Sequence, residues 1–227
     1  MNLNNIIIPS WHSVDTNHII VEECGESLIK LDTEASHRII YEPKYYKRNI
    51  PGAISHCYMR ESVYNKLYEA LNLLPNGFGF KIFDAWRPFA VQEFLYNEQV
   101  NKLINKSGLS YESAQEKAKK FVSCPSKDAS KPYVHATGGA IDLTIVNKQQ
   151  EELNMGTEFD DFSCLAETNS YELSEKQEVK HNRRLLYYVM TSVGFTNYPS
   201  EWWHYDYGDV FWASEKSINL SFYGGIF

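Results

Sequence analysis

The spacing of apolar residues divides the chain into helices and shorter strands. Residues 61–74 carry an apolar side chain at every third or fourth position, and the stretch that follows Pro88 repeats this spacing. Such a period places the apolar side chains on one face of a helix. Two further helices are expected over residues 110–121 and 174–193, and Gly194 ends the second.

Other segments alternate apolar and polar residues, or are apolar over a short length, which is typical of strands. Short alternating segments occur within residues 1–40, and the run AIDLTIV at 140–146 has the composition of a buried strand. Helices mixed with strands that are mostly linked as hairpins predict an α+β fold, with a small antiparallel sheet and flanking helices. Beyond the first 40 residues, strands are expected at 78–86, 140–146, 195–198 and 202–207.

Length, composition and charge limit the class of protein. The 227 residues, 43% hydrophobic, predict one domain over 1–227, in which an N-terminal extension, 1–40, packs on a core of about 41–207. A net charge of −7 argues against a nucleic-acid binder, because such proteins need a basic surface. No segment has the length and apolarity of a membrane span, and the N-terminus is a poor secretory signal. With four scattered cysteines, these features predict a cytoplasmic protein that needs no membrane. A homo-oligomer is left open.

Two pairs of polar residues stand out against this background. His135 and Asp142 lie in HATGGAID, and Glu201 and His204 lie in EWWH. A carboxylate in a strand as apolar as 140–146 is costly to bury unless it is paired or binds a cation. For either residue of the first pair alone, a salt-bridged core aspartate or a hydrogen-bonded histidine is the better interpretation.

Together, the two pairs predict a catalytic zinc site in a central cleft. His135, Asp142 and His204 supply the three ligands that one zinc ion per chain needs, with a fourth position open to water. Glu201 is left free as a general base, which indicates an amide hydrolase. Arg87 in DAWRP is the best candidate to stabilise the oxyanion. Its spacing equally allows a salt bridge to Asp84 or a surface arginine.

The motifs DAWRP, HATGGAIDLT, MGTEFDDF and EWWH, in this order, resemble those of the VanX-type D-alanyl-D-alanine dipeptidases, a family of zinc D,D-peptidases. The family pattern is SxHxxGxAxD followed by ExxH, and the resemblance extends over about residues 41–207. It implies the same zinc ligands, Glu201 as the base and Arg87 beside the tetrahedral intermediate.

The resemblance also implies substrate-binding residues. Asp160 or its neighbour Asp161 would meet the ammonium group of the substrate, and Tyr41 falls where the family has a tyrosine near the same group. Tyr133 replaces the family serine, and a phenol there would reshape the pocket. A packed aromatic remains an equally good interpretation of Tyr41.

Three functions are consistent with these residues. The first is hydrolysis of the small dipeptide D-alanyl-D-alanine to two D-alanines, under a covering segment at 101–132. The second is a D,D-carboxypeptidase or endopeptidase that cuts longer peptidoglycan peptides. The third is a non-catalytic zinc-binding protein, against which the free Glu201 and Arg87 argue. The sequence does not separate a role in glycopeptide resistance from a role in D-alanine recycling.

Overall fold

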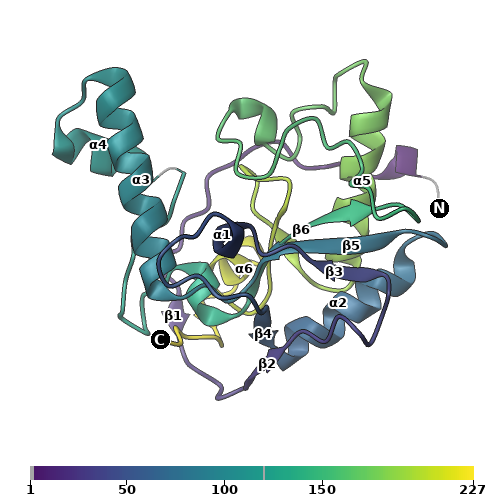
Figure 1. Cartoon of the computed structure of the whole chain (residues 1–227), viewed down its shortest axis with the longest axis horizontal. Coiled ribbons are helices and arrows are strands. Elements are labelled where there is room, and N and C mark those ends of the chain that lie inside the picture. The colour runs from purple at the N-terminus through teal and green to yellow at the C-terminus, as the bar shows by residue number, and fades with distance from the viewer. Residues whose placement is uncertain (1–2, 120) are drawn as a thin grey trace.

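A five-stranded sheet forms the centre of the computed structural model, which describes residues 3–119 and 121–227 (Figure 1). Its strands pair antiparallel, except that the edge strand β3 runs parallel to β5. In spatial order they are β3 (Ile39–Tyr41), β5 (Gly79–Asp84), β6 (Ala140–Val146), β8 (His204–Asp206) and β7 (Thr196–Asn197).

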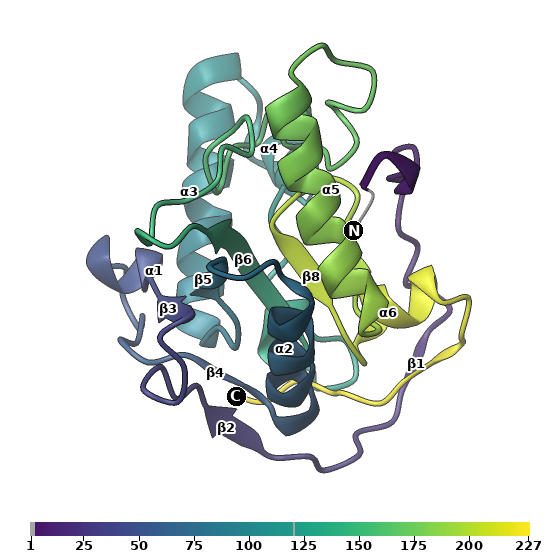
Figure 2. The same ribbon diagram turned by 90° about the vertical axis from the view of Figure 1, so that its right-hand side faces the viewer.

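Helices and two small strand pairs surround this sheet. In Figure 2, α2 and α5 lie side by side in front of the sheet, and α3 lies behind it. The helices are α1 (Lys44–Lys47), α2 (Glu61–Leu73), α3 (Phe89–Ser107), α4 (Tyr111–Ala118), α5 (Gln177–Ser192) and α6 (Val210–Glu215). The outer strands are β1 (Ile20–Val21) with β9 (Leu220–Ser221), and β2 (Leu28–Lys30) with β4 (Tyr58–Arg60). Short 3-10 turns are η1 (Leu3–Asn5), η2 (Val134–Thr137) and η3 (Cys164–Ala166).

The α+β class expected from the sequence is confirmed, and β6 has the bounds expected for it. The strand expected over 202–207 is shorter, because the amide of Glu201 donates to the carbonyl oxygen of Tyr198 in a turn, at 3.0 Å, and β8 begins only at His204. The parallel pairing of β3 departs from the purely antiparallel sheet expected. The single-domain organisation stays a prediction.

Strand β6 separates the main hydrophobic core from the polar face of the sheet. Ile141, Leu143 and Ile145 are completely buried and belong to the same core as the apolar faces of α2 and α5. Each such side chain contributes about 1.5–3 kcal/mol by its burial. Because successive side chains of a strand point to opposite faces, Asp142 and Thr144 lie on the other side. Burial of the three apolar residues therefore sets the face on which Asp142 appears.

Arg60 ties the turn η2 to the rest of the molecule. Its guanidinium group is 1% exposed, donates to the carbonyl oxygens of Thr137 and Gly224, and pairs with Glu23 at 2.7 Å. It also lies over the ring of Tyr223, 4.7 Å from the centroid. Segments far apart in sequence thus meet at one buried cation, which holds the end of η2 in place.

Candidate active site

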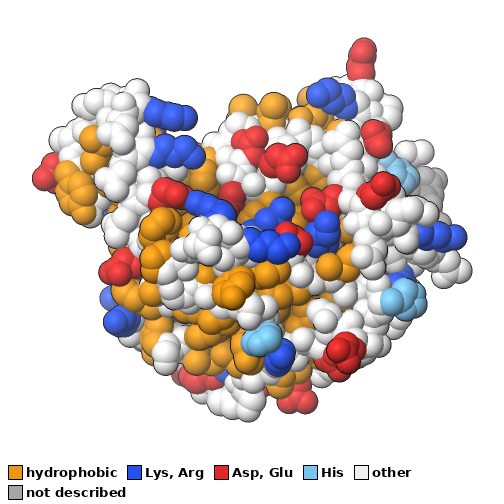
Figure 3. Space-filling view, viewed as in Figure 1, with side chains coloured by type: hydrophobic (Ala, Val, Ile, Leu, Met, Phe, Trp, Pro, Cys, Tyr) orange, Lys and Arg blue, Asp and Glu red, His pale blue; other side chains and the backbone are white. Residues whose placement is uncertain are grey.

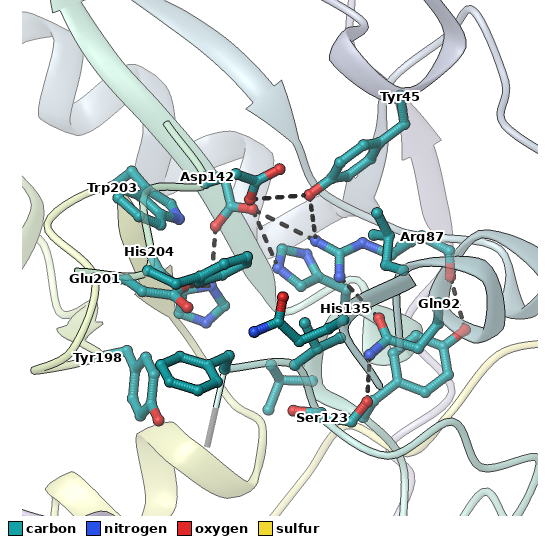
Figure 4. Close-up of a pocket in the computed structure, with 18 of the residues that line it drawn as sticks. Tyr45, Arg87, Gln92, Ser123, His135, Asp142, Tyr198, Glu201, Trp203 and His204 are labelled. Atoms are coloured by element: carbon teal, nitrogen blue, oxygen red, sulfur yellow. Dashed lines mark hydrogen bonds and ion pairs between the residues drawn. The ribbon is translucent and has the colours of Figure 1, made fainter. Parts of the chain in front are cut away.

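The pairing of β6 with β8 brings Asp142 and His204 together. The two residues are directly opposite in the antiparallel register, and His204 Nδ1 lies 2.9 Å from Asp142 Oδ1. His135 enters from η2, and its Nε2 lies 3.3 Å from Asp142 Oδ2. One donor atom from each of the three side chains falls within 4.8 Å of the others, and all three residues are buried. The structure therefore brings together the three ligands predicted from the sequence (Figure 4).

The hydrogen-bond partners of the two histidines differ. His135 Nδ1 lies 2.7 Å from the carbonyl oxygen of Ala85, so it donates there and leaves Nε2 as the acceptor. Both ring nitrogens of His204 face carboxylates, since Nε2 lies 2.8 Å from Asp206 Oδ1 and Nδ1 lies 2.9 Å from Asp142 Oδ1. Two imidazole nitrogens and one carboxylate oxygen fit the ligand set of a zinc site with an open fourth position.

Asp142 is held in its charged form. Burial raises the pKa of Asp142, but the adjacent His135 and His204 lower it more, so that it lies well below its usual range. A cation that binds here would therefore be coordinated by an ionised carboxylate that lies between two imidazole rings.

Glu201 lies beside this group without belonging to it. Its side chain is 16% exposed, and its Oε2 lies 3.9 Å from His204 Nδ1. Glu201 and the three predicted ligands line one cavity. Burial raises the pKa of Glu201 to about 8, and the carboxylates of Asp142 and Asp160 contribute to the rise. A carboxyl group that is easily protonated next to a metal group is suited to accept and return a proton.

Arg87 projects into the site from the loop after β5. An irregularity in the β5–β6 pairing places Asp84 opposite Asp142, and Asp84 Oδ2 accepts a hydrogen bond from Arg87 Nε at 2.6 Å. Arg87 Nη2 lies 3.6 Å from Asp142 Oδ2, and Nη1 donates to Gln92 at 2.8 Å. Arg87 thus forms the salt bridge to Asp84 and also lines the cavity beside the predicted ligands. Because Arg87 is only 7% exposed, the interpretation as a surface arginine is wrong.

The environment keeps Arg87 positively charged. Burial lowers its pKa, but Tyr45, Asp84 and Asp142 raise it more, and the net shift is upward. A fixed cation close to the metal group is placed to stabilise a developing negative charge.

One cavity of about 200 Å³ is lined by the three predicted ligands, by Glu201 and by Arg87. Lys102 of α3 and the later Lys119, Phe121, Val122 and Ser123 form part of its wall, so the segment expected to cover the site lies against it. In Figure 3, acidic and basic side chains form a band across the face below the projecting α3–α4 arm. Residue 120, within that segment, lies outside the described residues.

Asp160, rather than Asp161, lies in the cavity wall. Asp160 has a left-handed backbone (φ 61°), and its Oδ1 accepts a hydrogen bond from the Tyr45 hydroxyl at 3.3 Å. Burial raises the pKa of Asp160 to about 7. Asp161 instead accepts the backbone N–H of Ser163 at 2.7 Å and, among the described residues, is not part of the lining.

The structure places the two predicted tyrosines differently. Tyr133 lines the cavity, but its hydroxyl donates to the carbonyl oxygen of Arg87 at 2.9 Å, which commits the phenol to the loop that carries the arginine. Among the described residues, Tyr41 is absent from the wall of this cavity and lines two neighbouring ones.

Tyr45, which the sequence analysis did not single out, is the tyrosine that lies beside Asp160. Its hydroxyl lies between Asp160 Oδ1 and Arg87 Nη2, 3.4 Å from the latter. Tyr41 and Tyr45 both belong to the sequence YEPKYY, so the sequence pointed to the correct segment. Tyr45 is buried because it lies on the inner side of the short helix α1.

The loop that carries Asp160 is held by Arg183 of α5, which the sequence did not single out. Arg183 is 2% exposed and donates to the carbonyl oxygens of Met155, Leu165 and Glu167 at 2.6–2.8 Å. One side chain thus satisfies three backbone acceptors along the loop. Trp202 adds a bond from its Nε1 to Thr157 Oγ1 at 2.8 Å.

The sequence pattern of a known family, described as D-Ala-D-Ala dipeptidase, matches residues 43–219. The chain belongs to this family. Membership confirms the resemblance carried by the four motifs and the prediction of a peptidase. The buried His-Asp-His group fits the zinc ion that the sequence predicts.

Individual members of the family are also similar to the chain. A D-alanyl-D-alanine dipeptidase of Synechocystis sp. is 26% identical over 86% of the chain and 87% of that protein. The D-alanyl-D-alanine dipeptidase of Escherichia coli is 33% identical over 42% of the chain and 51% of that protein. Among solved structures, VanYB in complex with D-alanine-D-alanine is 16% identical, with a TM-score of 0.47, over 73% of the chain and 82% of VanYB. A likeness at that level supports no conclusion about function.

Within the described residues, every helix is too short or too polar to cross a bilayer.

Proposed function

We propose that the chain hydrolyses the dipeptide D-alanyl-D-alanine to two D-alanines, with one zinc ion held by His135, Asp142 and His204. The observation that carries this proposal is the buried His-Asp-His group with Glu201 and Arg87 on the same cavity. A purely structural metal site would need neither a free carboxylate nor a buried cation beside it.

The residues of the chain divide the chemistry among them. Zinc, when bound, supplies a Lewis acid that makes a water molecule more acidic and polarises the scissile carbonyl group. Glu201 accepts the proton of the attacking water and returns it to the departing amine. Arg87 stabilises the negative charge that develops on the former carbonyl oxygen, because its cation is already oriented by Asp84 and Gln92.

Size and charge of the cavity favour a dipeptide. Its volume of about 200 Å³ lies below the roughly 300–1,000 Å³ typical of sites for drug-sized ligands. Asp160 and Tyr45 form a polar group on the same wall as Arg87, where the carboxylate can pair with the free ammonium of a dipeptide. A longer peptide has an amide in place of this ammonium, so Asp160 would be left buried without a cation.

The test compares free D-Ala-D-Ala with the same dipeptide acetylated on its amine, using zinc-loaded protein and measuring D-alanine release. The proposal predicts turnover of the free dipeptide and a large loss on acetylation. Faster cleavage of the acetylated substrate would establish a D,D-carboxypeptidase instead. Bound zinc with no cleavage of either substrate, or of longer peptidoglycan peptides, would support a non-catalytic zinc-binding protein.

Replacing Asp160 by asparagine should raise KM for the dipeptide about 10- to 100-fold, the size expected for a charge-assisted hydrogen bond. The wild-type KM should also rise as the pH falls below about 7, because protonation removes the negative charge of Asp160. Steady-state kinetics against pH measure both effects. Asp161→Asn is the matched control, and an equal effect there would move the ammonium site by one residue.

Replacing Arg87 by lysine should lower kcat by about 100- to 1,000-fold, the usual cost of losing an oriented oxyanion donor. Lysine keeps the charge but cannot donate to Asp84 and Gln92 at once and still face the cavity. The control is Arg184→Lys, which changes an arginine of α5 that forms an ion pair with Glu172, and it is measured by the same steady-state kinetics. An unchanged kcat in Arg87→Lys would remove this residue from the mechanism.

A further inference from the structure

The strand that carries His204 leads into two buried aspartates for which the proposed mechanism has no role. Asp206 is 1% exposed and ends β8, and Asp209 is completely buried just before α6. Burying an isolated carboxylate is costly, so two of them close together require an explanation.

Asp206 contacts the far side of the His204 ring. The two residues lie on the same face of β8, and Asp206 Oδ1 is 2.8 Å from His204 Nε2. Ala140, the residue opposite Asp206 on β6, is small and completely buried, so it leaves room for this contact. When Nε2 donates its hydrogen to Asp206, the lone pair of the ring is at Nδ1, and Nδ1 faces Asp142.

Asp209 lies close enough to Asp206 for their carboxyl groups to share a hydrogen bond. Its Oδ1 accepts the N–H groups of Phe211 and Trp212, both at 3.0 Å, and so caps α6. The remaining oxygens, Asp206 Oδ2 and Asp209 Oδ2, are buried. In the described part of the chain, no N–H group and no hydroxyl group donates a hydrogen bond to either of them. Two ionised carboxylates are acceptors only, so they can bond to each other only if one carries a proton.

The surroundings of Asp209 favour the proton on this residue. Burial raises its pKa well above the usual range, and the neighbouring Asp206 raises it further. The neutral acid can then donate from one oxygen to Asp206 while the other oxygen caps the helix.

We propose that Asp206 is a positioning residue that presents Nδ1 of His204 to the metal, and that a neutral Asp209 holds Asp206 in place by a carboxyl–carboxylate hydrogen bond. This inference rests on the proposed role of His204 as a zinc ligand. A carboxylate behind a metal-bound imidazole fixes its tautomer and makes it a stronger ligand. The neutral Asp209 fixes that carboxylate without adding a second buried negative charge.

The first test needs no substitution. A long-range proton–nitrogen NMR spectrum of the zinc-loaded protein should show His204 with a hydrogen on Nε2 and none on Nδ1. Comparison with His204→Gln protein assigns the signal. A hydrogen on Nδ1, with Nε2 as the free nitrogen, would overturn the inference.

The second test compares two isosteric variants. Asp206→Asn removes the charge behind His204 and should weaken zinc binding about 10- to 100-fold in competition with a chelator. Asp209→Asn should change the zinc affinity by less than about threefold, because asparagine caps helices well and its amide can donate to Asp206 as the neutral acid does. An unchanged affinity in Asp206→Asn would overturn the role of Asp206. If Asp209→Asn loses as much zinc affinity as Asp206→Asn does, the inference that Asp209 is neutral would be overturned.

A failure of this inference can be distinguished from a failure of the proposed function. If His204→Gln binds zinc as tightly as the wild-type protein, His204 is not a ligand and the proposed site itself is wrong. If His204→Gln loses zinc but Asp206→Asn does not, only the inference about Asp206 fails. Should Asp206→Asn not fold, as judged by circular dichroism, the NMR spectrum of the wild-type protein still decides.

Discussion

The Glu201→Gln protein should retain its zinc ion and lose D-Ala-D-Ala turnover by about 100- to 10,000-fold, the usual contribution of a general acid–base group. Glutamine has the shape of glutamate but cannot accept a proton from water. Zinc should stay bound because Glu201 stands outside the group of three ligands, with its Oε2 3.9 Å from His204 Nδ1.

Two measurements on the same preparation check this expectation: zinc content by atomic absorption, and kcat from D-alanine release. Glu178→Gln, a change on the exposed start of α5, is the control for the substitution itself. If Glu201→Gln loses both its zinc and its turnover, the result would indicate that Glu201 is a zinc ligand. Normal turnover in Glu201→Gln would assign the base to another residue.

The Asp142→Asn protein should lose both zinc and turnover. Asp142 is the central member of the group, with one oxygen 2.9 Å from His204 and the other 3.3 Å from His135. It is also the only carboxylate among the three ligands, so its replacement leaves a cation with two neutral imidazoles. We expect the zinc content to fall from about one ion per chain to a small fraction of that value.

Zinc content and turnover are measured as for Glu201→Gln, which serves here as the variant that keeps the metal. Circular dichroism of the zinc-free proteins separates loss of the metal from loss of the fold. Asp142→Asn protein that is folded and holds a full complement of zinc would contradict the assignment of Asp142 as a ligand.

The four longest helices, α2 to α5, and the central strand β6 could be predicted because each follows a local rule, whereas the short helices α1 and α6 were not predicted. The apolar periods of α2 and α3 and the breakers at Gly77 and Pro88 depend only on neighbouring residues. Pairing partners do not follow from such rules. The parallel addition of β3 beside β5, and the irregularity that turns Asp84 toward Asp142, arise from contacts between distant segments.

For the candidate site, the sequence by itself determined which chemical groups are available. Two histidines, one aspartate in an apolar strand, a free glutamate and an arginine before a proline are chemical facts of the chain, and they predicted the family and the ligand set. Burial strengthens this prediction, because an apolar strand tolerates a carboxylate only where a partner or a cation compensates it.

Only the tertiary structure decided which neighbours each of these groups has. It turned Tyr45 rather than Tyr41 toward Asp160, committed Tyr133 to a backbone carbonyl, and placed Asp206 behind His204. The physical reason is that hydrogen bonds and charge interactions act over a few ångströms in space. Spacing along the chain determines such distances only within one helix or strand, and the active site is assembled from several.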